Sequence, residues 1–302
     1  MNRPNTASLR AQLGPVGVWS NRIGETSAST ERTAAKTIES LGYGALWFGE
    51  TPHSKEALVH ASILLQATSA MTIATGIANV YGRDPLAAES AANALADAFD
   101  NRFILGLGAS HAPLVKARGH SYTGPLTAVR DYLNAMDTVS YAPPKPAAVP
   151  RVLGALRPRM LELARDRTAG AHPYFVPVAH TKLAREVLGP DRILAPELMV
   201  ILESDPTAAR ALARGTTAGF LALPNYANNL RELGYSDDDL AGGGSDRLVD
   251  DIVAWGTLDE IQNRVEAHLD AGADHVAIQP LAADLGFQLQ QLRILAHVLL
   301  DR

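Results

Sequence analysis

A glycine-rich segment that ends in a histidine is the part of the sequence best suited to chemistry. Residues 102–111 read RFILGLGASH, an apolar run that passes through Gly106 and Gly108 and stops at His111. Small residues at the end of a strand let a flat ligand approach the backbone closely, and a histidine beside that ligand can transfer a proton near neutral pH. The segment therefore predicts a cofactor contact followed by a proton-transfer group. A tight turn packed on glycine, with an incidental histidine, is the alternative that the segment alone leaves open.

Other segments also place a small, polar or charged residue at or near the end of an apolar run. Glu50 closes one run, where a carboxylate either orients a ligand ring or caps the next helix. Gly76 interrupts another, which is typical of a bulge or of a close approach to the backbone. Arg157 stands at an expected helix start, where arginine and a helix N-terminus both favour phosphate, although the residue taken alone slightly favours a surface arginine. His172 lies inside a later run, as a satisfied core histidine or as a catalytic one.

Several common chemistries lack their motifs. The sequence has no cysteine, which rules out disulfides, thiolate nucleophiles and cysteine-ligated metals. Its nine histidines show no His-x-x-x-His spacing, so we expect no metal centre. Neither a Gly-x-Ser-x-Gly elbow nor a Gly-Lys-Ser/Thr loop is present. A dinucleotide turn needs a third glycine and a helix that begins at once, and because His111-Ala112-Pro113 follows Gly108, we reject that interpretation.

Composition indicates a globular protein with no sign of a nucleic-acid or membrane partner. The chain has 302 residues, 47% of them hydrophobic and 20% charged, with a formal net charge of −5. This charge argues against nucleic acid and anionic membranes as partners, and no apolar stretch is long enough to span a bilayer. The first residues, MNRPNT, lack the apolar core of a signal peptide. We therefore expect a soluble, cytoplasmic protein.

Strand-like and helix-like segments alternate along the chain. We expect strands at 13–20, 44–50, 71–79, 102–110, 151–156, 170–176, 194–202 and 275–281. We expect helices at 30–41, 55–69, 85–99, 127–139, 159–167, 181–188, 207–214, 258–271 and 288–300. Such alternation is typical of a parallel sheet with helices outside it, and eight units fit a closed (β/α)8 TIM barrel better than an open sheet. We predict a single α/β domain over residues 1–302, with a helical or irregular excursion at about 220–255. The site of such a barrel lies at the carboxyl ends of its strands.

Three strand ends taken together resemble one family. The stretches LWFGE at 46–50, ATGIAN at 74–79 and ILGLGAS at 104–110 occur in this order. They resemble the bacterial luciferase-like family, and most of all its branch that depends on the deazaflavin coenzyme F420. The resemblance spans nearly the whole chain and is strongest over 13–137. It implies the same (β/α)8 barrel that the alternation predicts, with the coenzyme lying across the carboxyl ends of the strands.

The resemblance also implies which residues contact the coenzyme. They are Glu50, Gly76, Ile77, Asn79, Ala109, Ser110, Leu156 and Arg157. The Gly76-Ile77 peptide takes the position of a cis bond that supports the middle of the ring. Leu156 and Arg157 stand where relatives have a phosphate-contacting pair of glycines, and at this departure we expect Arg157 to pair with the phosphate instead.

The acid/base residues differ from those of the sugar-phosphate dehydrogenases in this family. His111 takes the place of their glutamate acid/base, and Glu50 that of the acidic residue closing the second strand. Thr51 stands where those enzymes have a catalytic histidine, so we do not expect the same substrate. His53 lies two residues further on, and we consider it a partial substitute.

Three functions follow from this resemblance. The first is an F420-dependent oxidoreductase that exchanges a hydride with an organic substrate, with His111 moving the matching proton. The second is an FMN-dependent monooxygenase that uses molecular oxygen, and the third is a non-catalytic flavin-binding protein of the same fold. The family also forms homodimers through the helices that follow the second and third strands, where small residues permit either a partner or this chain's own barrel to pack closely: Ala87, Ala88, Ala91, Ala92, Ala94 and Ala96.

Overall fold

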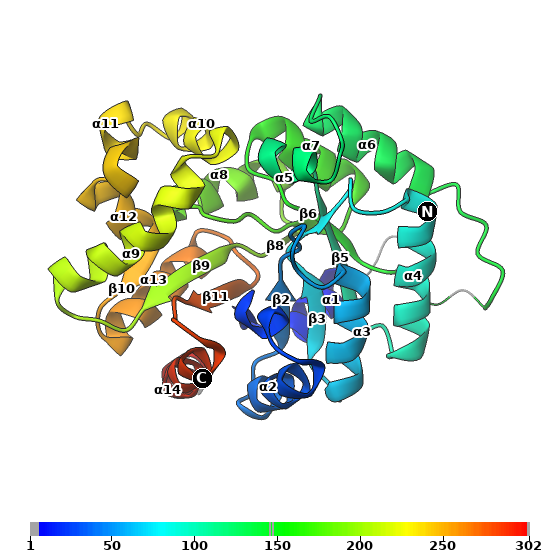
Figure 1. The fold of residues 1–302 in the computed structure, drawn as a ribbon, viewed down its shortest axis with the longest axis horizontal. Helices are drawn as coiled ribbons and strands as arrows, with labels where there is room; N and C mark the ends of the chain where they lie inside the picture. Colours follow the sequence, from blue (N-terminus) through cyan, green and yellow to red (C-terminus); the bar gives the residue numbers. More distant parts are fainter. Residues whose placement is uncertain (1–5, 145, 147, 301–302) are drawn as a thin grey trace.

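Parallel strands alternate with helices along the chain (Figure 1). The computed structural model describes residues 6–144, 146 and 148–300, so the expectation about the first residues lies almost entirely outside the described part. The strands that form the barrel are β1 (Val16–Trp19), β2 (Ala45–Phe48), β3 (Thr72–Thr75), β5 (Phe103–Gly108), β6 (Arg151–Leu153), β7 (Gly170–Ala171), β8 (Ile193–Leu194), β9 (Glu197–Ile201) and β11 (Val276–Pro280).

Strand pairing closes this sheet into a barrel. From β1 each strand pairs in parallel with the next, through β2, β3, β5, β6 and β7 to β8. β8 and β9 are halves of one strand, separated by Ala195 and Pro196, and β9 pairs with β11, which pairs with β1. Proline has no N–H to donate to a ladder, which explains the break, although its carbonyl still accepts a bond of 2.9 Å from the Ala277 N–H. The (β/α)8 prediction is confirmed.

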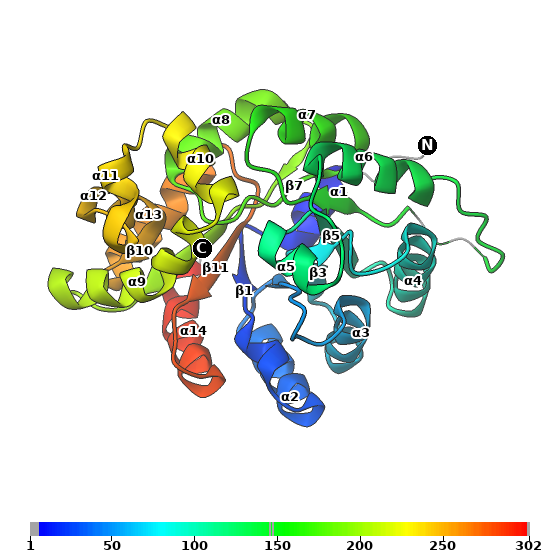
Figure 2. The ribbon, with the colours of Figure 1, turned by 45° about the horizontal axis from the view of Figure 1, so that its top comes forward.

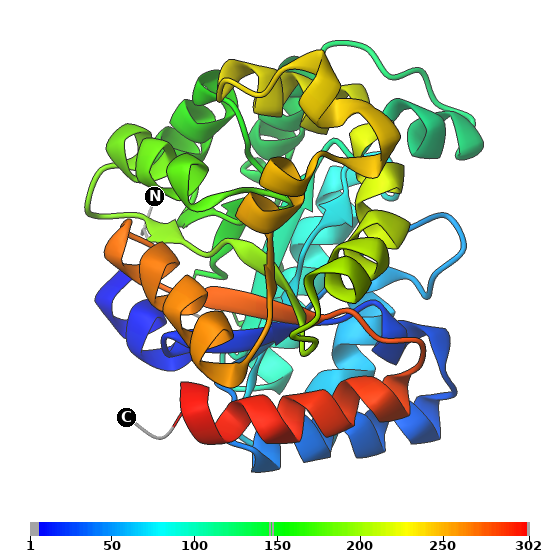
Figure 3. The ribbon, with the colours of Figure 1, turned by 90° about the vertical axis from the view of Figure 1, so that its left-hand side faces the viewer.

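Helices surround the barrel, as Figures 2 and 3 show from two further directions. They are α2 (Ala28–Ser40), α3 (Ala57–Ala67), α4 (Pro85–Ala98), α6 (Pro125–Met136), α7 (Pro158–Arg167), α8 (Val178–Leu188), α13 (Leu258–Asp270) and α14 (Leu285–Leu299). Several begin at a side-chain cap. Ser27 accepts a bond from the backbone N–H of Thr30 at the start of α2, and Asp84 caps α4 ahead of a proline at its first position. Within the described residues no helix is both long and apolar enough to cross a membrane.

Several elements differ from the sequence-based expectation. The expected strand 71–79 is divided into β3 and β4 (Ala78–Asn79) by the bulge at Gly76 and Ile77. The short helices α1 (Thr6–Leu13) and α5 (Ala112–Ala117) were not expected. A helix does begin directly after His111, because a proline is compatible with a first helical turn, so that part of the argument against a dinucleotide turn is wrong. The missing third glycine still excludes it.

The excursion between β9 and α13 is mostly helical. It contains α9 (Pro206–Leu221), α10 (Pro224–Glu232), α11 (Asp237–Leu240), a 3-10 turn η2 (Ala241–Gly243), α12 (Asp246–Ile252) and the strand β10 (Val253–Trp255), which adds to β9. The expected helix 207–214 continues through two glycines to Leu221. The excursion packs its own apolar cluster on the barrel, and Figures 1 and 2 show its helices at one side of the molecule.

The alanines of α4 serve two surfaces. Ala88, Ala92 and Ala96 are buried against this chain's own barrel, whereas Ala87 and Ala94 are exposed. Half of the expected contact stripe is therefore used within the chain. A homodimer on the exposed half stays a prediction.

Candidate active site

A cavity of about 590 Å³ opens at the carboxyl ends of the barrel strands. Most of the residues expected to contact a coenzyme line it: Glu50, Gly76, Ile77, Ala109, Ser110, Leu156 and Arg157, together with His111. Ligand and cofactor cavities usually span about 300–1,000 Å³. The structure thus brings residues from the ends of four strands to one concave site of suitable size.

Ile77 is seated on glycines. The Gly76-Ile77 peptide bond is cis, as the resemblance implies. A Cβ atom added at Gly108 would lie 2.9 Å from Ile77 Cγ1, and one at Gly154 would lie 3.2 Å from Ile77 Cγ2. A Cβ at Gly76 itself would lie 2.7 Å from His172 Nε2. Side chains at Gly108 and Gly154 would therefore crowd Ile77, and one at Gly76 would crowd His172.

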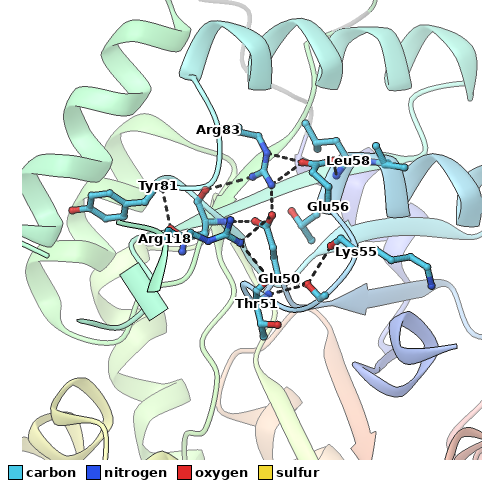
Figure 4. A network of polar contacts seen from close by, with 12 residues as sticks. Glu50, Thr51, Lys55, Glu56, Leu58, Tyr81, Arg83 and Arg118 are labelled. Carbon is cyan, nitrogen blue, oxygen red and sulfur yellow. Dashed lines mark hydrogen bonds and ion pairs between the residues drawn. The ribbon is translucent and has the colours of Figure 1, made fainter. Parts of the chain in front are cut away.

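Glu50 is held by cationic and backbone donors (Figure 4). One carboxylate oxygen accepts a 2.8 Å bond from the Asn79 N–H. The other pairs closely with Arg83 and lies 3.5 Å from Arg118 Nη2. The Glu50 side chain is only 3% exposed. Its carboxylate ties the end of β2 to the segment after the bulge, so it is not a free acid or base on the cavity wall.

Two expected residues lie away from the cavity. Asn79 is fully buried, and its Oδ1 accepts a 2.9 Å bond from the Tyr81 N–H. Its side chain does not line the cavity, so a direct coenzyme contact has no support in this geometry. His53 is exposed on the loop after β2 and is also absent from the cavity wall. The expectation that His53 replaces the missing histidine is wrong for this geometry, whereas Thr51 does line the cavity.

His111 lies on the cavity wall where α5 begins. Ser110 before it adopts φ of 58°, in the left-handed region, which turns the chain out of β5. The His111 ring centroid lies 5.0 Å from that of Tyr226, and within the described residues its imidazole has no hydrogen-bond partner. Burial lowers the pKa of His111, so the ring is neutral at pH 7 and keeps one donor and one acceptor nitrogen.

The start of α7 forms the charged end of the cavity. Leu156 turns its carbonyl away, toward His180 Nε2 at 2.6 Å. Arg157 Nη1 lies 3.1 Å from a carboxylate oxygen of Glu232 on α10. Arg159 also lines this end and has no ion-pair partner in the described part of the chain. The arginines are thus placed where an anionic group of a ligand would be held.

The floor of the cavity is uncharged. His172 Nδ1 lies 2.6 Å from the Ala195 carbonyl oxygen and must donate to it, which leaves Nε2 as a bare acceptor. The His172 ring stacks on Trp47 at 4.3 Å, and Trp47 Nε1 donates to His275 Nε2 at 3.1 Å. Burial lowers the pKa of both histidines to about 4. These two histidines of the barrel interior are therefore neutral at pH 7.

Sequence analysis missed an aromatic wall on one side of the cavity. Tyr174 follows β7, and Phe220 and Tyr226 come from the excursion, with ring centroids 5.2 to 6.3 Å apart. Glu197 lies near these rings, buried on β9, and accepts a 3.2 Å bond from the Phe175 N–H; burial raises its pKa to about 8. In the sequence, the residues at the start of the excursion that indicate a pocket-lining segment are Asn225, Tyr226, Asn228 and Asn229, and two of them, Asn225 and Tyr226, line the cavity.

Metal binding has no support in the geometry. No group of three or more metal-ligating side chains forms among the described residues. Related proteins indicate which kind of organic ligand such a cavity binds.

The chain is similar to F420-dependent and FMN-dependent enzymes. A 5,10-methylenetetrahydromethanopterin reductase of Methanolobus tindarius is 27% identical over 172 residues, which cover 50% of this chain and 53% of that protein. The chain thus matches about half the length of this curated relative. An F420-dependent secondary alcohol dehydrogenase, solved with an F420-acetone adduct, superposes with a TM-score of 0.75 at 13% identity over 95% of this chain and 99% of that one.

Two further solved structures share the fold. The coenzyme F420-dependent tetrahydromethanopterin reductase of Methanopyrus kandleri gives a TM-score of 0.74 at 16% identity and covers 94% of this chain and 97% of its own. The oxygenating constituent of 3,6-diketocamphane monooxygenase of Pseudomonas putida, in complex with FMN, gives 0.71 at 15% identity with the same coverages. The model of the luciferase-like monooxygenase family matches residues 13–275. The chain therefore belongs to the luciferase-like monooxygenase family.

Proposed function

We propose that this protein is an oxidoreductase that binds a tricyclic deazaflavin or flavin in the cavity, with coenzyme F420 as the preferred partner. The observation that carries the proposal is the bulge of Gly76 and Ile77 at the mouth of a closed barrel, beside a cavity of about 590 Å³. Two fold neighbours that depend on F420 support F420, whereas the neighbour solved with FMN keeps FMN as the second candidate.

The residues present fit such a ring. Gly108 and Gly154 let Ile77 pack against the strand ends, and the Gly76-Ile77 bulge then lies on the cavity wall, where it would support a flat tricycle. A neutral floor avoids desolvating a charge beneath the ring, and His172 Nε2 and Glu197 Oε1 are buried polar atoms without a partner in the described chain. The arginines at the start of α7 suit the phosphate of the ring's side chain.

The coenzyme, when bound, supplies the hydride chemistry, and the chain supplies position and a proton. His111 is neutral because of its burial, so its N–H donates to a substrate oxygen or its bare nitrogen accepts a proton from one. Tyr174 and Tyr226 exclude water on the same side of the cavity. We assign Glu50 a positioning part, because its three donors keep the loop after the bulge in place.

Coenzyme binding is the first test. Fluorescence titration and thermal shift with F420 and with FMN separate the two candidates, since a ligand at 100 times its Kd stabilises the native state by about 2.7 kcal/mol. We expect saturable micromolar binding of F420 and much weaker binding of FMN. Preference for FMN would favour the monooxygenase, and binding of neither would refute the proposal.

Substitution of His111 tests the proton-transfer part. In an F420-linked assay over a panel of alcohols and carbonyl compounds, His111→Ala should retain coenzyme binding and lose about 10²–10⁴-fold in kcat, the usual contribution of a positioned acid or base. His53→Ala is the matched control, because His53 is exposed and outside the cavity. Equal turnover of both variants would remove His111 from the mechanism. Coenzyme binding without turnover of any compound would favour the non-catalytic alternative.

A further inference from the structure

An ion pair crosses the rim of the cavity between α7 and the excursion. Arg157 Nη1 and Glu232 Oε1 are 3.1 Å apart, and their side chains are 45% and 51% exposed. Glu232 is the last residue of α10, and both residues line the cavity. A carboxylate thus stands at the charged end of the site, beside the arginine that the proposed function assigns to a phosphate.

The charged residues at the α7 end of the cavity sum to a net charge of +1. Arg157 and Arg159 contribute two positive charges and Glu232 one negative charge, which leaves a net charge of +1 among the charged residues that line this end. Glu50, the other acidic residue on the cavity wall, is paired with Arg83 and lies at a different strand end. A phosphate that approaches Arg157 therefore meets one uncompensated positive charge and, within a few ångströms, a carboxylate.

We propose that Glu232 determines which phosphate the site accepts, by disfavouring a doubly charged monoester relative to a singly charged diester. The inference rests on the proposed function and specifies its ligand. A phosphate monoester carries a charge of about −1.5 to −2 at pH 7, since its second pKa is near 6, whereas a diester carries −1. FMN ends in a monoester and F420 contains a diester, so at the phosphate itself the carboxylate of Glu232 favours F420. Because the pair is half exposed, the discrimination is a matter of several-fold in affinity.

Three ligands that share one ring system and differ in phosphate charge test this proposal directly. Riboflavin, riboflavin 4′,5′-cyclic phosphate and FMN share the tricycle. They carry no, one and up to two negative phosphate charges, respectively. Their Kd values are measured by fluorescence titration at pH 8 and low salt for the wild type and Glu232→Gln, and the series is repeated with the 5-deaza analogues. Glu186→Gln is the matched control, because Glu186 is exposed on α8, outside the cavity.

We expect the gain in affinity on Glu232→Gln to increase with the phosphate charge of the ligand. Glu232→Gln should tighten FMN about three- to tenfold, the cyclic phosphate by less, and riboflavin by less than about twofold. The gain for FMN should shrink at pH 5.5, where the monoester loses part of its second charge. Arg157→Gln should weaken both phosphates and leave riboflavin unchanged.

Two results would overturn the inference while the proposed function survives. The first is an FMN-to-riboflavin affinity ratio that Glu232→Gln leaves unchanged, and the second is an equal gain for riboflavin, which would make Glu232 a steric rather than an electrostatic element. Failure of every flavin and deazaflavin ring to bind the wild type and all three variants would instead refute the proposed function, and this inference with it.

Discussion

A single methyl group at Gly108 tests whether glycine at the strand ends makes room for Ile77. A Cβ at Gly108 would lie 2.9 Å from Ile77 Cγ1 and 3.0 Å from Cδ1, whereas carbon atoms in contact prefer about 3.5–4.0 Å. Gly108 is buried at the end of β5 and its φ is not in the left-handed region, so any residue can adopt its backbone. The whole effect therefore comes from the contact, and we expect Gly108→Ala to destabilise the protein by about 1–3 kcal/mol, as overpacking does.

The second half of the test is a rescue. Ile77→Ala removes the two atoms that the new methyl group meets, so in that background Gly108→Ala should cost less than about 0.5 kcal/mol. Gly154→Ala meets Ile77 at the longer distance of 3.2 Å and should cost less than Gly108→Ala. Gly215→Ala is the control, because it has open space in the middle of α9 and should be neutral or stabilising by up to about 1 kcal/mol.

Urea unfolding followed by circular dichroism gives the four free energies of the cycle. A favourable coupling of about 1–2.5 kcal/mol between positions 77 and 108 is expected. If the two single effects add within about 0.5 kcal/mol, Ile77 does not occupy the space above Gly108, and the packing argument for the glycines is refuted.

Three further predictions concern buried charge. Glu50→Gln should cost about 3 kcal/mol in urea unfolding, the lower end for a broken buried pair, because Glu56 still pairs with Arg83 at 2.7 Å; a loss below 1 kcal/mol would contradict it. Burial lowers the pKa of His172 and His275 to about 4, so the unfolded chain takes up protons first and stability should fall from pH 6.5 to pH 4, by up to about 1.4 kcal/mol per pH unit for each group. A urea midpoint that stays constant over this range would count against neutral histidines. Burial raises the pKa of Glu197 to about 8, so the stabilisation that its protonated carboxyl gives the fold is present below pH 4.5 and is lost as the pH rises to 8. Glu197→Gln should therefore lose less unfolding free energy than the wild type between pH 6 and 8.5. If the unfolding free energies of the two proteins change in parallel with pH, the carboxyl is not protonated in the folded state.

The barrel could be predicted from the sequence because its strands are short apolar runs with helices between them. The breaks within two of the expected strands were not predicted, because each depends on the backbone of one or two residues. Strand 194–202 is divided at Pro196, which lacks a donor, and strand 71–79 is divided at the Gly76-Ile77 bulge. A proline or a glycine marks such a position in the sequence. The sequence does not show that β8 pairs with β7 while β9 pairs with β11, because this change of neighbour follows from closure of the barrel.

The site was predictable where it follows a strand end and unpredictable where its partners are distant. The positions of Gly76, Ile77 and His111 follow from their place after a strand. The pairing of Glu50 with Arg83 and Arg118 joins residues 33 and 68 positions away, and no local pattern reports such a partner. His53 failed for the complementary reason, because two residues on a loop suffice to turn a side chain away from the cavity.

The placement of charge links the fold to the proposed chemistry. Inside the barrel, His275 and Trp47 pair with neutral partners: His275 Nδ1 donates to the Gly14 carbonyl at 2.8 Å, and Trp47 Nε1 donates to His275 Nε2. The ion pairs of the site lie outside the barrel interior: Glu50 pairs with Arg83 after the end of β2, where both side chains are largely buried, and Arg157 pairs with Glu232 at the exposed rim. Because an unpaired charge in a low-dielectric interior costs far more than one at the surface, a ligand with a flat neutral ring and an anionic tail matches this arrangement. A compact polyanion would instead have to place its charge above the neutral His172 on the cavity floor.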